Sequence, residues 1–161
     1  MYVSQTVMGF LERSGIDYDL VTHRHSAHSL QTARNARIEP EQLAKGVLMF
    51  DDEEYWLAVI PASCRVNRWA LESLIGSEHM SFAGEEHMPQ LFRDCERGAL
   101  PICGNAFGVR TAFDDHLLES DDVYFEAGDH EHLVHLTRNQ FLRLVMGHPH
   151  GAISHRSRMR A

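Results

Sequence analysis

One residue of this chain stands out by its type and its position. Lys45 is the only lysine among 161 residues, and the other basic residues are all arginine. It precedes an apolar run, residues 46–50 (GVLMF), which predicts a strand covered on both faces. Lysine is a compact point charge whose pKa moves when water is removed, unlike the planar arginine fork. A lone ammonium at the entrance of such a strand is either solvated at the rim or placed to meet negative charge.

Other reactive side chains give weaker patterns. His23, His25 and His28 form an HxHxxH segment, but no carboxylate or cysteine follows at a familiar ligand spacing, so we predict no metal site. Cys95 and Cys103 stand outside any recognisable Cys-His signature, and we interpret both as buried, inert thiols. The chain has no GxSxG elbow, which argues against Ser-His-Asp catalysis.

Length and composition indicate a single globular domain. The apolar content is 43% and the charged content 24%, which is ordinary for a protein with a full-sized core. Three unevenly spaced cysteines without a CxxC pair indicate a reducing compartment, and we expect a cytoplasmic location. The sequence shows neither a signal peptide nor an apolar stretch long enough to cross a bilayer, so no membrane partner is predicted.

The net charge of −8 is unevenly distributed. Residues 147–161 contain no acid but carry Arg156, Arg158 and Arg160, so residues 1–146 hold the remaining −11. An acidic body is a poor general binder of nucleic acid, and DNA is not expected as a partner. Contact with RNA would be confined to a small cationic mouth, helped by the arginine tail. Because the tail lacks apolar periodicity, we predict a folded domain over 1–146 and a disordered tail over 147–161.

Short helices and strands alternate along the chain. The predicted helix N-caps are Ser4, Ser29, Asn67 and Thr137, the last in a capping box with Gln140. Strands are predicted over residues 17–22, 46–51, 55–60, 79–83, 99–102, 109–113, 123–127 and 133–136. The hairpin at 46–60 and the crowded strands after residue 98 argue against a pure βαβ repeat. We therefore predict an α+β fold with a curved mixed β-sheet, partly barrel-like, and helices packed around it.

Five segments occur in an order that resembles one known family. They are HRHSAHS at 23–29, QLAK at 42–45, LAVIPA at 57–62, DCERGALP at 94–101 and YFEAGDH at 124–130. This succession is similar to the YbaK/prolyl-tRNA-synthetase-associated family, whose members deacylate aminoacyl-tRNA in trans or as editing domains inside synthetases. The resemblance covers about residues 3–146.

The resemblance implies hydrolysis of the ester that joins a wrong amino acid to a tRNA 3′ end, without a cofactor. Such editing is needed because a missing methylene changes binding by only about 1–3 kcal/mol, so a synthetase pocket cannot reject smaller amino acids strongly. Lys45 matches the lysine most tied to activity in the family. It would hold the terminal nucleotide or its phosphate, or offset charge on the ester oxygen as water attacks. We favour charge and positioning over general-base chemistry for this residue.

The remaining site residues are also implied by the resemblance. The family's Gly-x-x-x-Pro loop is matched by Gly98 and Pro101, which here stand one residue closer together, with Ile102 in the fifth position. His130 matches a pocket histidine that could bond ester or ribose oxygens or relay a proton, although a loop histidine bonded to Asp129 or solvent is the plainer interpretation. The resemblance thus implies Lys45, Gly98 and His130 as catalytic residues. The residues it implies for substrate binding are Ser29, Ala99, Leu100, Pro101, Gly128 and Asp129.

Two functions remain open from the sequence. The first is a free-standing aminoacyl-tRNA deacylase, with Lys45 at the mouth of a small, mostly apolar pocket. Its partners would be the acceptor end of a mischarged tRNA, meaning the amino acid and the terminal adenosine, with a synthetase as a further candidate. The second is a non-catalytic module that binds an amino acid or a nucleotide on the same scaffold. The acidic surface and the shortened loop favour the second, whereas Lys45 and the turn at 128–130 favour the first.

Overall fold

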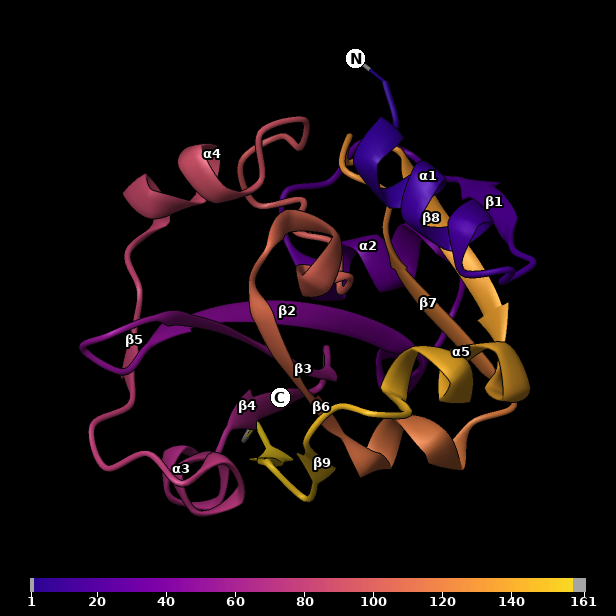
Figure 1. Cartoon of the computed structure of the whole chain (residues 1–161). Helices are drawn as coiled ribbons and strands as arrows, with labels where there is room; N and C mark the ends of the chain where they lie inside the picture. The colour runs from indigo at the N-terminus through magenta and orange to yellow at the C-terminus, as the bar shows by residue number, and fades with distance from the viewer. Residues whose placement is uncertain (1, 158–161) are drawn as a thin grey trace.

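The computed structural model describes residues 2–157 and contains one large mixed sheet with helices on both faces (Figure 1). The helices are α1 (Gln5–Arg13), α2 (Ser29–Ala36), α3 (Arg68–Ile75), α4 (Met88–Leu91) and α5 (Arg138–Val145). Short 3-10 helices are η1 (Pro40–Gln42), η2 (Glu85–His87), η3 (Gly104–Phe107) and η4 (Asp115–Glu119). The strands are β1 (Asp19–Thr22), β2 (Leu43–Phe50), β3 (Tyr55–Pro61), β4 (Cys64–Val66), β5 (Ser81–Phe82), β6 (Arg110–Asp114), β7 (Asp122–Glu126), β8 (His132–Thr137), β9 (His150–Gly151) and β10 (Ser154–Arg156).

The sheet is centred on the predicted hairpin of β2 and β3. Its strand order is β1-β8-β7-β2-β3-β6-β9, with β5 also paired to β2. The hairpin strands run antiparallel, whereas β2 pairs with β7 and β3 with β6 in parallel, so the sheet is mixed as predicted. The α+β class is therefore confirmed. No helix within residues 2–157 combines the length and the apolar character needed to cross a bilayer.

Helix ends follow the capping chemistry of the sequence in three of four cases. Ser4, Asn67 and Thr137 each accept a hydrogen bond from a backbone amide in the first turn of α1, α3 and α5, respectively. The box between Thr137 and Gln140 is closed in both directions. Ser29 differs: it is the first residue of α2, and His28 takes the N-cap position. These caps fix where each helix leaves the sheet.

Three apolar clusters pack against the two faces of the sheet. The largest joins α1 and α5 to one face, through residues such as Val7, Phe141 and Leu57. On the other face, α3 packs over Trp56 and its neighbours, while α2 packs over a smaller cluster. Successive residues of β3 alternate between these faces, so the central hairpin is covered on both sides, as the apolar run predicts.

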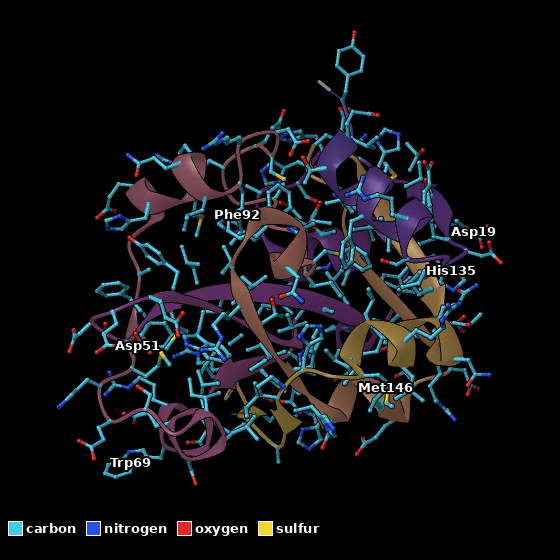
Figure 2. The ribbon with its side chains drawn as sticks, viewed as in Figure 1. Asp19, Asp51, Trp69, Phe92, His135 and Met146 are labelled. Carbon is cyan, nitrogen blue, oxygen red and sulfur yellow. The ribbon has the colours of Figure 1, made fainter. Side chains whose placement is uncertain are left out.

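Two predictions about strands are wrong. Strand β2 begins at Leu43, so Lys45 is its third residue and not a residue before its entrance. Residues 99–102, predicted as a strand, form an irregular buried segment that packs into the main core. Trp69 lies on the outer side of α3 with 84% of its surface exposed, whereas Phe92 is inside the molecule (Figure 2). Figure 2 also shows His135 of β8 beside Asp19 of β1, a pair of atoms 3.3 Å apart.

The C-terminal segment corrects the expectation of a disordered tail. Strand β9 pairs with β6 and strand β10 pairs with β4, so residues 150–156 belong to the fold (Figure 1). Ile153 between them is 1% exposed and packs with the α3 cluster. One apolar residue and a set of backbone hydrogen bonds are enough to order a segment that lacks helical or strand periodicity. The predicted tail residues 158–161 lie outside the described part of the chain.

We predict that Ile153→Ala lowers the free energy of unfolding by about 2–4 kcal/mol, because it leaves a cavity under α3. Urea unfolding followed by circular dichroism measures this change. The matched control is Ala152→Ser, since Ala152 is exposed and should shift the midpoint little. Equal midpoints for Ile153→Ala and the control would show that the C-terminal segment is not packed on the domain.

Candidate functional site

Lys45 lines a cavity of about 590 Å³. The walls come from six parts of the chain: the start of α2, the helix η1, strand β2, the β3–β4 turn, strand β4 and the end of strand β10. The lining residues are His28, Ser29, Leu30, Pro40, Glu41, Lys45, Ala62, Ser63, Cys64, Arg65, Arg156 and Ser157. The cavity is more polar than the mostly apolar pocket expected from the sequence, since its walls carry three cationic side chains and one acid among the described residues.

Strand geometry directs the lysine into this cavity. Lys45 is half-buried and pairs with Ile60 of β3, and its Nζ donates to the Ala62 carbonyl oxygen at 3.4 Å. Burial lowers the pKa of Lys45 from its ordinary value, and the nearby Arg65 guanidinium adds to this lowering, while Cys64 opposes it. An ammonium has three donors, and the Ala62 contact occupies one. The group is therefore a partly desolvated cation placed at a cavity wall.

The start of α2 forms a second wall of the cavity. His28, Ser29 and Leu30 all line it, and the first backbone amides of the helix lie at this end. A helix N-terminus carries partial positive charge from its free amides, so it adds to the cationic character of the walls. Ser29 lines the cavity as the first residue of the helix and not as its cap, and its binding of a substrate stays a prediction.

His130 and Gly98 lie together behind this helix start. His130 Nε2 donates to the Arg97 carbonyl oxygen at 2.6 Å, and a Cβ at Gly98 would lie only 3.4 Å from the imidazole. Both residues have positive φ, +83° for Gly98 and +62° for His130, a conformation that a histidine adopts uncommonly. His130 Nδ1 is buried and finds no hydrogen-bond partner within residues 2–157. The imidazole therefore clamps the loop at residue 97, and Asp129 is not its partner.

The segment 26–29 connects the two groups of predicted residues. Its first half contacts His130 and Gly98. The Ser26 amide donates to the His130 carbonyl oxygen at 3.4 Å, and the Ala27 carbonyl oxygen lies 4.0 Å from the Cβ position of Gly98. Its second half lines the lysine cavity. A movement of the segment 26–29 would therefore change both its contact with His130 and the wall of the lysine cavity.

The structure does not bring the rest of the loop to the lysine cavity. Ala99, Leu100 and Pro101 are buried, and Leu100 belongs to the core cluster under α1 and α5, on the face of the sheet opposite the Lys45 side chain. The Pro101 carbonyl oxygen lies 3.3 Å from the Cβ position of Gly46, so the loop packs against strand β2 on the face opposite the Lys45 side chain. Shortening of the loop by one residue is consistent with this supporting position.

The turn at 128–130 has a structural role in this arrangement. Gly128 has φ +109°, and a Cβ there would lie 3.1 Å from Ser4 Cβ, so only glycine fits. Asp129 is buried and accepts hydrogen bonds from the amides of Glu131 and His132 and from the His132 ring. These contacts hold the turn at the end of β7 and thereby fix the backbone of His130.

Glu126 is a polar residue of this region that the sequence analysis missed. It follows Phe125, which pairs with Ala44, so it projects from the same face of the sheet as Lys45. Its Oε1 accepts a weak hydrogen bond from Thr32 of α2 at 3.4 Å, and its Oε2 is buried without a partner in the described chain. Burial raises the pKa of Glu126 to about 8, and nearby acids add to this. Period-two alternation in residues 122–126 places Glu126 on the face opposite Val123 and Phe125, so the local pattern does not reveal that this acid is buried.

The histidine segment does not form a metal centre within the described residues, where no group of three potential ligand side chains converges. His23 is buried and its Nδ1 contacts the Arg24 carbonyl oxygen at 2.7 Å. The His25 ring lies 5.2 Å from the His130 ring, and His28 lines the lysine cavity. The three histidine side chains therefore lie in three different environments.

Sequence comparison defines the class of protein. The model of the aminoacyl-tRNA editing domain matches residues 23–144, which is most of the chain, and the chain belongs to this family. The matched range includes β2, α2 and the turn at 128–130 but ends before β9 and β10. Among curated proteins, no sequence matches the chain.

Solved structures share the fold at low sequence identity. The hypothetical protein APE2540 is 17% identical with a TM-score of 0.83, covering 94% of this chain and 100% of its own. A protein described as "a putative trans-editing enzyme for prolyl tRNA synthetase" is 20% identical with a TM-score of 0.80, covering 96% and 99%. A "putative signal transduction protein" from Marinobacter aquaeolei VT8 is 15% identical with a TM-score of 0.74; the match covers 95% of this chain but 31% of that one. At these identities the likeness shows the fold alone.

We predict that the pKa of Lys45 lies below the ordinary lysine value of 10.5, because burial disfavours its charged form. Reductive methylation with ¹³C-formaldehyde labels one side-chain amine in this chain, in addition to the N-terminus, so the NMR signal of Lys45 can be titrated without ambiguity. The same titration in 6 M urea gives the unfolded reference. Identical titration curves in the two states would contradict the burial of this amine.

We predict that Glu126→Gln stabilises the protein more at high pH than at low pH. The folded-state pKa of about 8 lies above the ordinary value of 4.5, so the folded protein retains a proton that the unfolded chain loses. Stability should therefore fall as pH rises from about 4.5 through 8, and the amide variant should lack this loss. Urea unfolding at pH 5 and pH 8.5 measures the difference, with Glu131→Gln at an exposed position as control. An equal effect of Glu126→Gln at both pH values would refute the prediction.

Proposed function

We propose that this protein is a free-standing aminoacyl-tRNA deacylase that hydrolyses mischarged tRNA in trans. The observation that carries the proposal is the half-buried Lys45 at the wall of a cavity in a chain of the aminoacyl-tRNA editing domain family. The family match supplies the substrate class, and the lysine supplies a cation where negative charge would develop. The fold shared with a trans-editing protein for prolyl tRNA synthetase agrees with this class.

The proposed chemistry uses water as the nucleophile. The water oxygen forms a bond to the ester carbonyl carbon, and the carbonyl oxygen becomes an oxyanion. The Lys45 ammonium and the first amides of α2 offset this charge. The bond to the ribose oxygen then breaks, the proton lost by the attacking water passes to that oxygen, and the free amino acid and tRNA leave. The cycle needs no cofactor, and Lys45 stays protonated throughout.

The other predicted residues act as supports in this proposal. His130 and Gly98 hold the backbone of the segment 26–29, whose second half contacts the substrate. Ser29 is placed to donate to the ribose or to the amino acid. Gly128 and Asp129 fix the turn that carries His130, while Pro101 packs against Gly46 of β2 and Ala99 and Leu100 are buried next to it in the chain.

The second candidate is a non-catalytic module that binds an amino acid or a nucleotide in the same cavity. The burial of the loop at 99–101 away from the lysine favours this alternative, because that loop then contributes no group to a substrate. The fold also makes up 31% of a longer protein described as acting in signal transduction. Measured turnover decides between the two.

We predict that the purified protein releases amino acid from at least one tRNA misacylated with alanine, serine, cysteine or threonine. Lys45→Met, which keeps the apolar stem, should lower kcat by at least about a hundredfold, the scale of losing one electrostatic contact in a transition state. Turnover should persist in EDTA. The matched control is Arg68→Ala, which removes an exposed charge at another cavity. No turnover on any of the four, or equal rates for Lys45→Met and wild type, would favour the binding module.

A further inference from the structure

The wall of the lysine cavity that faces α2 is built partly by the C-terminal strand. Arg156 and Ser157 both line the cavity, and both come more than ten positions after Leu144, the last residue of the family match. Arg65 of β4 lines the same cavity. Arg156 therefore lies outside the range of the family match, whereas Arg65 and Lys45 lie within it.

Backbone pairing places the two arginines on adjacent strands but one register position apart, so their side chains leave opposite faces of the β4–β10 ribbon and reach the cavity from its two sides. Strand β10 runs antiparallel to β4, with Arg156 opposite Cys64 and His155 opposite Arg65. The Ser157 amide donates to the Ser63 carbonyl oxygen at 3.0 Å. The position of Arg156 is thus set by main-chain contacts on the strand that carries it.

Hydrogen bonds also hold the beginning of β10. The Asn67 amide donates to the Ile153 carbonyl oxygen at 2.8 Å. The Ser154 hydroxyl donates to Asp114, a buried carboxylate that also accepts from the His116 amide and ring. A strand held by a buried acid at one end and by backbone bonds at the other is a rigid support for an exposed cation.

The charges around the cavity are unusual for this chain. The whole chain carries −8, yet the cavity walls hold Lys45, Arg65 and Arg156 against the single acid Glu41 among the described residues. Arg156 contacts Glu41 at 3.4 Å, but the two side chains are 82% and 47% exposed. An exposed pair of this kind contributes little, so the guanidinium is free to take another anion.

The depth of the three cations differs. Lys45 is half-buried at the floor of the cavity, whereas Arg65 and Arg156 are exposed at its edge. Guanidinium groups match phosphate oxygens in a bidentate manner, and a compact ammonium suits a single oxygen. An ester at the floor and a ribose-phosphate at the edge would use both kinds of group.

We propose, on the basis of the deacylase function above, that Arg65 and Arg156 bind phosphates next to the terminal adenosine of the tRNA. The C-terminal strand then acts as the RNA-binding wall of the cavity, and Lys45 faces the ester. The Glu41 carboxylate pairs with the Arg156 guanidinium when RNA is absent, and a phosphate of the RNA replaces the carboxylate when RNA binds. An otherwise acidic protein can in this way bind RNA through one small basic surface.

The test measures hydrolysis kinetics on two substrates and, separately, the binding of uncharged tRNA. The variants are Arg65→Ala, Arg156→Ala and Glu41→Gln, with Arg68→Ala as the matched loss of an arginine outside the cavity. We expect Arg156→Ala and Arg65→Ala each to raise KM for aminoacyl-tRNA about tenfold with kcat little changed, and to leave KM for aminoacyl-adenosine, which has no phosphate, unchanged. Glu41→Gln should lower KM for aminoacyl-tRNA. Thermal unfolding of each variant checks that the fold is retained.

Binding of uncharged tRNA provides a readout that does not depend on turnover. Fluorescence anisotropy over a range of salt concentrations should give a slope of log Kd against log salt that falls by about one for each arginine removed. An unchanged slope and affinity in Arg156→Ala and Arg65→Ala would overturn the proposal, as would an equal rise in KM for the phosphate-free ester. If no mischarged tRNA is hydrolysed by the wild type, the deacylase function fails, and the binding assay still decides the role of the two arginines.

Discussion

The site depends on the alternation of side chains along strand β2. Leu43 packs under α2 and Met49 packs under α3, and both lie on the face of the sheet that also carries Lys45. The lysine therefore falls between two apolar clusters, at a place where neither helix covers the sheet. The cavity is that uncovered space, and a one-residue shift of β2 would turn the amine into the core of α1 and α5.

The opposite face of the same strand explains where the glycine-proline loop lies. Gly46 leaves room for the Pro101 carbonyl oxygen, and a side chain there would also meet Leu57. The loop therefore packs tightly beneath β2 and supports the strand from the face away from the lysine. Its glycine end emerges beside His130, whose imidazole holds the backbone at residue 97. Loop and turn thus act on the cavity through the segment 26–29.

Polar burial is concentrated in this neighbourhood. Glu126 Oε2 and His130 Nδ1 are both buried without partners in the described chain, and Glu126 carries a raised pKa because of its burial. Unsatisfied buried groups reduce stability, and these two are both linked to Ser26, Glu126 through Thr32 and His130 through its carbonyl oxygen. Such cost is commonly found where a structure serves binding or catalysis.

The sequence by itself determined the central hairpin, the α+β class and the caps at Ser4, Asn67 and Thr137, because these rest on local periodicity and on capping within a few residues. Tertiary structure alone decided the rest. The order of residues 150–156 comes from pairing with β4 and β6, partners distant in the chain, which no local pattern encodes. The same holds for Glu126 and for the burial of the loop at 99–101, since burial is a property of the packed sheet and not of the segment.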